Sequence, residues 1–226
     1  MEAINNAGAA VGILTAEGVI LGAERKQTSK LLERSRLSEK IYLFDEHIAC
    51  AAAGLTSDAN ILIDYARRAS QGHRYYYQQP MPVEQLVRQI CNAKQAYTQH
   101  GGLRPFGVGF LYAGWDELLG FQLYSSDPSG NYGGWKAIAI GMNNQNASNV
   151  LKEEYKEGLS LQEGLQLALK VVCKSMDTTS PAADKCKCHT VELVTLTKAA
   201  APKYTALTEA QIAQVLKDAH LVQEGN

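Results

Sequence analysis

Two groups of residues in this sequence have side chains suited to metal binding or to acid–base chemistry. Cys186, Cys188 and His189 lie close together and offer thiol and imidazole groups, the ligands that zinc prefers. Their spacing differs from that of usual zinc sites, and no second cluster completes a four-coordinate site. Asp58 and Asp127 are candidates for a catalytic pair of carboxylates, but each lies in a sequence typical of a helix cap or a turn. We therefore expect no metal, no other cofactor and no carboxylate-based active site.

Clusters of glycine and of tyrosine suggest two further functions, nucleotide binding and nucleic-acid binding. The glycine-rich segments at 101–107 and 130–136 lack the Gly-Lys-Ser/Thr ending of a phosphate-binding loop and any GxGxxG motif opening a helix, so nucleotide binding is not expected. Tyr75, Tyr76 and Tyr77 have rings of the kind that stack on nucleic-acid bases. The net charge of −1, however, argues against nucleic acid or an anionic membrane as the main partner. We therefore interpret the tyrosines as packing against a neighbouring chain.

The composition is typical of a globular protein. The chain has 226 residues, of which 46% are hydrophobic and 20% charged, so we expect a single domain over residues 1–226. No apolar run reaches the length of about 18 residues that predicts a membrane span, and no secretory signal is expected. The cysteines are five in number, and those at 50, 91 and 173 lie in apolar patterns. We expect buried reduced thiols in a cytoplasmic or nuclear protein.

Hydrophobic periodicity and turn signals divide the chain into strands and helices. Short apolar runs predict strands at 10–14, 19–23, 41–44, 48–53, 108–113, 120–124, 135–140 and 191–197. Stripes of helical spacing predict helices after residue 56, after Pro82, at 147–157, after residue 160 and after residue 208. The expected helix caps are Thr56, Ser57, Asp58, Ser160 with Glu163 and Thr208 with Gln211.

The order of these elements predicts the fold class. Strands come in groups instead of alternating singly with helices, which favours antiparallel sheets with helices on their outer faces. Two stacked sheets, covered on both sides by helix pairs, would bury every apolar face. We therefore predict an α+β fold, a four-layer αββα sandwich, with a mobile loop at 177–187.

Several longer motifs are more specific than this pattern. The two most specific are YTQHGGLRPFGV at 97–108 and SDPSGNYGGWKA at 126–137, with GWD at 114–116 between them. Shorter ones are GIL at 12–14, AER at 23–25, SEKIY at 38–42 and AGLTSDA at 53–59. Together these motifs, spread over most of the chain, resemble those of the proteasome α subunits, most closely the alpha type-4 subfamily.

This resemblance implies both a fold and a role. The fold is that of the N-terminal-nucleophile hydrolases, the same αββα sandwich. The role is that of a non-catalytic structural subunit in the seven-membered α ring of the 20S core, which supports assembly, substrate gating and activator docking in ATP- and ubiquitin-dependent protein degradation. The implied partners are neighbouring α subunits, a β subunit and activators or the regulatory particle, in the cytoplasm and nucleus. Neither nucleic acid nor a membrane is among them.

The resemblance also assigns three positions. In the proteolytic β relatives, an N-terminal threonine is the nucleophile and its own amine is the base. Alignment on Gly12 and Gly18 places Gly8 at that position, where no side chain can attack. The acid and lysine of the β subunits fall on Glu24 and Lys40, interpreted first as a structural ion pair. In α rings the matching lysine lines a pocket between subunits, so Lys40 is also expected to bind the C-terminal carboxylate of an activator.

The sequence departs from the family at its ends, and two other functions stay open. It begins inside the first family helix, so we expect the N-terminal gating tail, and a basic-acidic C-terminal tail, to be absent. One alternative is an autonomous N-terminal-nucleophile amidase or peptidase, for which Thr15 is the nearest threonine but lies mid-strand. The other alternative is a stand-alone homo-oligomeric scaffold.

Overall fold

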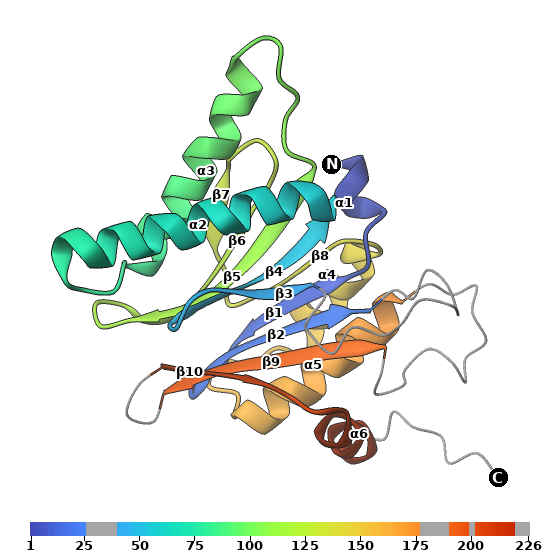
Figure 1. Cartoon of the computed structure of the whole chain (residues 1–226). Helices are drawn as coiled ribbons and strands as arrows, with labels where there is room; N and C mark the ends of the chain where they lie inside the picture. Colours follow the sequence, from blue (N-terminus) through green and yellow to red (C-terminus); the bar gives the residue numbers. More distant parts are fainter. Residues whose placement is uncertain (26–39, 177–189, 199–201, 220–226) are drawn as a thin grey trace.

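Two five-stranded antiparallel sheets stack face to face in the computed structural model, which describes residues 1–25, 40–176, 190–198 and 202–219. Figure 1 shows helices α2 and α3 on one side of the stack and α5 and α6 on the other. The chain is therefore an α+β protein, and the predicted αββα sandwich is confirmed.

The first sheet has the strand order β10-β9-β2-β1-β8. Its strands are β1 (Ala10–Leu14), β2 (Gly18–Glu24), β8 (Ala137–Ile140), β9 (Val191–Lys198) and β10 (Pro202–Ala206). The helices packed on its outer face are α4 (Asn144–Glu154), α5 (Leu161–Ser175) and α6 (Glu209–Asp218). Buried side chains such as Ile20, Leu169 and Ile212 fill the space between this sheet and its helices.

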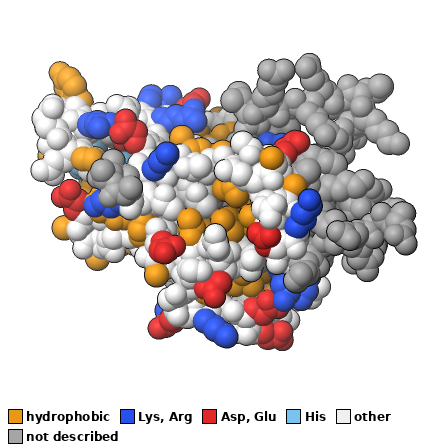
Figure 2. Space-filling model, turned by 90° about the horizontal axis from the view of Figure 1, so that it is seen from below, with side chains coloured by type: hydrophobic (Ala, Val, Ile, Leu, Met, Phe, Trp, Pro, Cys, Tyr) orange, Lys and Arg blue, Asp and Glu red, His pale blue; other side chains and the backbone are white. Residues whose placement is uncertain are grey.

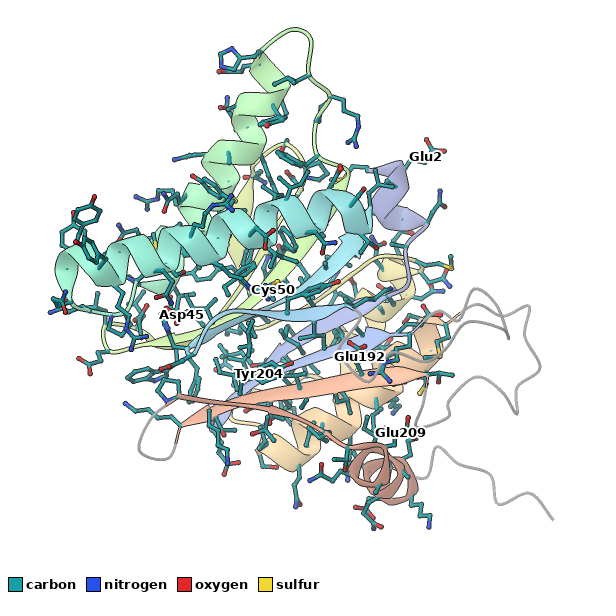
Figure 3. The ribbon with its side chains drawn as sticks, in the orientation of Figure 1. Glu2, Asp45, Cys50, Glu192, Tyr204 and Glu209 are labelled. Carbon is teal, nitrogen blue, oxygen red and sulfur yellow. The ribbon has the colours of Figure 1, made fainter. Side chains whose placement is uncertain are left out.

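The second sheet has the strand order β3-β4-β5-β6-β7. Its strands are β3 (Ile41–Asp45), β4 (Ile48–Gly54), β5 (Val108–Asp116), β6 (Gly120–Ser126) and β7 (Tyr132–Gly134). Its outer face is covered by α2 (Thr56–Tyr77) and α3 (Val83–Gln99), and a short helix α1 (Glu2–Asn5) precedes β1. Cys50 points from β4 toward these helices (Figure 3), where it joins the apolar cluster beneath them.

A third apolar cluster lies between the two sheets. Leu21 and Val194 enter it from the first sheet, and Ala49, Ala51 and Leu111 enter it from the second. The small alanine side chains of β4 suit a closely packed layer between two sheets. The start of β1 and the end of β2 lie beside the start of β3, where the candidate site is found.

Two of the predicted helix caps are confirmed by the structure, and a third is not. Ser160 and Thr208 both form the predicted capping boxes, with Glu163 and Gln211. The N-cap of α2 is instead Leu55, which has no side-chain cap bond, so the capping role predicted for Thr56, Ser57 and Asp58 is wrong. The Asp58 carboxylate is taken by other partners, described below.

Two short strands were not predicted. β7 has only three residues, two of them glycine, and β10 begins with a proline and is largely polar. Neither has the apolar alternation that signals a strand. The helix predicted at 147–157 begins three residues earlier and ends three residues earlier. The loop predicted at 177–187 lies outside the described residues.

The surface carries mixed charge. Figure 2 shows acidic and basic side chains scattered over one face among apolar ones. This pattern agrees with the net charge of −1. Within the part of the chain that the structure describes, no helix is both long and apolar enough to cross a membrane.

Candidate functional site

Gly8, Glu24 and Lys40 come together at one end of the sandwich. Gly8 precedes β1, Glu24 ends β2, and Lys40 directly precedes β3. Pairing between β1 and β2 extends past Ala10, because the Glu24 amide donates to the Ala9 carbonyl at 2.9 Å. The Glu24 carboxylate turns back and accepts from the Ala9 amide at 3.1 Å. The three positions that the resemblance singled out therefore form one cluster.

The Lys40 ammonium occupies the space next to Gly8 that a side chain would need. A Cβ built on Gly8 would collide with Lys40 Nζ and would lie 3.0 Å from Glu24 Oε2. The Gly8 backbone is also closely packed, because a Cβ built on Gly141, which has φ +96, would lie 2.7 Å from the Gly8 carbonyl oxygen. This arrangement offers a carboxylate and an ammonium, with glycine between them.

Thr15, the nearest threonine, is engaged elsewhere. It lies just past β1, in the turn to β2, so the predicted mid-strand position is wrong. Its buried hydroxyl donates to the Gly18 carbonyl at 2.9 Å and accepts from the Gly18 amide at 3.1 Å. Both bonds hold the turn closed, so Thr15 serves as a turn residue.

A buried glutamate on β9 supports the same end of the sandwich. Glu192 is 5% exposed and accepts from Arg25 Nε at 2.7 Å. It also accepts from the Lys40 backbone amide at 3.4 Å. Figure 3 shows Glu192 near the start of β9. The sequence analysis did not single out Glu192, although a lone acid inside the apolar run VELVTL is a usable signal.

A second polar cluster locks the glycine-rich segment at 101–107 onto α2. Asp58 accepts two hydrogen bonds from the Arg104 guanidinium and one from the Gly107 amide at 2.8 Å. The Arg104 guanidinium holds the pKa of the Asp58 carboxyl below its ordinary value. Gly54, with φ +129, lets the Gly107 carbonyl approach the start of α2. The loop is thus a rigid structural element.

The carboxylates proposed as a catalytic pair belong to separate structures. Asp127 accepts from the backbone amides of Ser129 and Asn131 within its own turn, as predicted from turn chemistry. Asp58 pairs with Arg104 instead. The metal candidates Cys186, Cys188 and His189 lie outside the described residues, and among the described residues no group of potential ligands gathers.

The cysteines only partly match the expectation. Cys50 and Cys91 are buried free thiols, and burial raises the pKa of both. Cys173 is disulfide-bonded, so the prediction of a reduced thiol is wrong there. Sequence alone gives the count and spacing of cysteines but not their pairing.

The tyrosines at the end of α2 lie open on the surface. The exposed fractions of Tyr75, Tyr76 and Tyr77 are 76%, 79% and 67%. The Tyr75 and Tyr76 rings meet edge to face. Packing of these rings against a neighbouring chain stays a prediction.

Comparison with known proteins identifies the family. The family model described as "Proteasome subunit" matches residues 4–191. The chain belongs to the proteasome subunit family. Its sandwich and the cluster at Gly8 therefore occur in a family whose members assemble into a multi-subunit particle.

Plant proteins similar to this chain have α-subunit names. One from Arabidopsis thaliana, Proteasome subunit alpha type-4-A, is 60% identical over 185 residues, which cover 82% of this chain and 74% of that protein. One from Spinacia oleracea, Proteasome subunit alpha type-4, is 53% identical over 223 residues, or 99% of this chain and 88% of that protein. A Petunia hybrida protein of the same name is 60% identical over 185 residues, or 82% and 74% of the two chains. The resemblance inferred from the motifs is confirmed.

Proposed function

We propose that this chain is a non-catalytic structural subunit of the α ring of the proteasome core. Its similarity to relatives named alpha type-4, over 74% to 88% of their length, supports the ring position. The absence of catalysis is supported by one observation above all, the Lys40 ammonium in the space where a side chain at Gly8 would begin. A nucleophile at that position needs both a hydroxyl or thiol and room for it.

The proposed partners follow from this position in a ring. They are two neighbouring α subunits at the sides, a β subunit below and activators above, in the cytoplasm and nucleus. Contacts between non-identical neighbours close such a ring by heterologous interfaces. The proposed role of Lys40, beyond filling the space beside Gly8, is to attract the C-terminal carboxylate of an activator.

The decisive experiment is the native mass of the tagged chain, purified gently from its own cells. A particle of several hundred kilodaltons that contains other α and β chains is the expected result. A single chain with its own peptidase activity would favour the amidase alternative, although the bonded Thr15 hydroxyl argues against it. A large assembly of this chain alone would favour the scaffold alternative. The peptidase assay is run on each species, so the three outcomes are distinct.

A further inference from the structure

The edge strands of the two sheets are protected unequally. β3 has a bulge between Leu43 and Asp45, and Arg67 Nε donates to the Leu43 carbonyl at 2.9 Å. β10 begins with Pro202 and exposes Lys203, and β7 is only three residues long. Bulges, prolines, charges and short length all discourage another chain from pairing with an edge.

The edge of β8 is also short, with four residues, but it lacks the other three features. Its sequence is Ala-Ile-Ala-Ile, with no proline, charge or bulge. No strand pairs with its outer side within the described residues. An unprotected edge presents main-chain N–H and C=O groups as a template for an added strand.

The register with β1 shows which groups face outward. The Leu14 amide donates to the Lys136 carbonyl at 2.8 Å, so Leu14 and Lys136 form a hydrogen-bonded pair. In an antiparallel ladder such pairs alternate with non-bonded ones, so Ile138 and Ile140 also face β1. Ala137 and Ala139 therefore direct their N–H and C=O groups to the open edge.

A groove runs along this edge. It has a volume of about 770 Å³ and lies between residues 134–139 and one side of α4. Alanine side chains at 137 and 139 point toward the helix layer and leave this space. The α4 wall carries mostly amide and hydroxyl groups, with one cation and one leucine, and its residues are Asn144, Gln145, Ser148, Asn149, Leu151 and Lys152. Tyr155, just after the helix, also lines the groove. The amide and hydroxyl groups of this wall can hydrogen-bond with polar side chains of an extended peptide.

The charges of the groove favour an acidic occupant. Lys136 and Lys152 are its charged lining residues. Lys136 is paired with Glu157. Lys152 is exposed and forms no ion pair with another described residue. A carboxylate on the incoming segment would therefore find a cation beside the strand edge.

We propose that the β8 edge and the α4 wall bind a short extended segment of a neighbouring subunit, which adds a strand to the first sheet and places a carboxylate beside Lys152. Main-chain hydrogen bonds to Ala137 and Ala139 would fix the register, as in other strand-addition complexes. This inference rests on the proposed function, because it takes its partner from the assembled particle.

Residue-resolved hydrogen exchange on the free chain and on the assembled particle tests it. In the free chain, the Ile138 and Ile140 amides should exchange slowly and those of Ala137 and Ala139 fast. On assembly, exchange at Ala137 and Ala139 should slow by at least about tenfold, the size of one net hydrogen bond. A particle in which both stay fast would overturn the inference and leave the proposed function intact. A chain that never enters a particle would contradict both.

Two pairs of variants sharpen the test. Ala139→Pro removes only an outward N–H, so the free chain should keep its unfolding midpoint while its entry into particles falls about tenfold or more. Ile138→Pro, one residue away, removes a bond to β1 and should destabilise the free chain itself. Lys152→Glu should also reduce entry, whereas Lys156→Glu, outside the groove, should not. Normal entry of both Ala139→Pro and Lys152→Glu would refute the docking site.

Discussion

The guanidinium of Arg104 binds both oxygens of the Asp58 carboxylate, with distances of 2.6 and 2.9 Å, although the two residues lie 46 positions apart in the sequence. The Asp58 side chain is 6% exposed and that of Arg104 is 66% exposed. The ion pair therefore closes over a nearly buried carboxylate at the start of α2. It ties the loop before β5 to the helix that covers the second sheet.

Removing the arginine should leave that carboxylate without its main partner. We expect Arg104→Ala to lower the free energy of unfolding by about 1–3 kcal/mol, because Asp58 keeps only its Gly107 bond. Arg104→Lys should recover part of the loss, since lysine supplies charge without the planar fork. Chemical denaturation of the three proteins measures the effect. Equal stability of all three would show that the pair contributes nothing.

The same pair predicts a response to acid. Arg104 lowers the pKa of Asp58 in the folded chain, so the stabilisation is present above the unfolded pKa and is lost as pH falls through the folded pKa. In Arg104→Ala this share of the acid sensitivity should vanish. Unfolding free energies across the acidic range would reveal it as a difference between the two curves.

Buried Lys94 predicts that stability also rises with pH in the alkaline range. Its ammonium donates to the Val108 carbonyl and the Ser126 hydroxyl, and burial lowers its pKa to about 8. The unfolded chain therefore binds more protons between the two pKa values, so this group makes stability rise with pH by about 2 kcal/mol from about pH 7 to about pH 9.5. Lys94→Met should lack this rise, and the difference between the two proteins cancels the titration of other groups. Parallel curves would contradict the low pKa.

A side chain at position 8 should be tolerated poorly and should not create catalysis. We expect Gly8→Thr to cost about 1–3 kcal/mol of stability, because Lys40 and Glu24 have to move. Gly72→Ala is the control: it lies in α2 with open space around it, so it should gain about 0.5–1 kcal/mol. Neither protein should cleave a fluorogenic peptide. Turnover by Gly8→Thr alone would show that the site still accepts a nucleophile.

A comparison of Gly120 with Gly130 distinguishes the cost of an unfavourable backbone conformation from the cost of a steric clash. Gly130 and Gly120 both have positive φ, +87 and +72, but only Gly130 has neighbours where a Cβ would go, with the Cys91 carbonyl oxygen at 2.5 Å. Gly130→Ala should therefore cost about 1–3 kcal/mol more than Gly120→Ala. Thermal unfolding of both variants checks the difference. Equal losses would mean that the turn moves freely away from α3.

Binding of an activator tail tests the second role of Lys40. Lys40→Ala should weaken binding of a peptide with the C-terminal sequence of an activator, because the terminal carboxylate of the peptide loses the Lys40 ammonium as its partner. The affinity is measured on assembled particles. The same peptide with an amidated C-terminus should bind weakly to both particles. Unchanged affinity in Lys40→Ala particles would remove Lys40 from the docking pocket and leave it only beside Gly8 and Glu24.

The sequence predicted the layers of the fold better than the individual polar contacts. Apolar runs and capping boxes located most elements, because each depends on residues close together in the chain. The partners of Asp58 and Glu192 depend on residues 46 and 167 positions away, and no local pattern encodes such distances. Lys94 could have been found, because it interrupts the apolar stripe of α3 four residues after Ile90.

The candidate site was predicted for a different reason. Gly8, Glu24 and Lys40 were selected by resemblance, since a glycine and two charged residues carry no chemical signal of their own. The position of the ammonium against the glycine could come only from the structure, because neighbouring residues in the sequence do not fix the direction of the Lys40 side chain. The resemblance thus identified the three residues, and the structure showed that the Lys40 ammonium fills the space of a side chain at position 8.

The open edge of β8 also has a consequence for the chain before it finds its partners. Among the described residues, β8 is a sheet edge that no proline, charge or bulge protects, so an orphan chain offers it as a template to any extended polypeptide, including another copy of itself. Its solubility should then depend on how closely its synthesis is matched to that of the other subunits. A surplus would self-associate at high concentration, and balanced production would keep the edge covered from the moment of assembly.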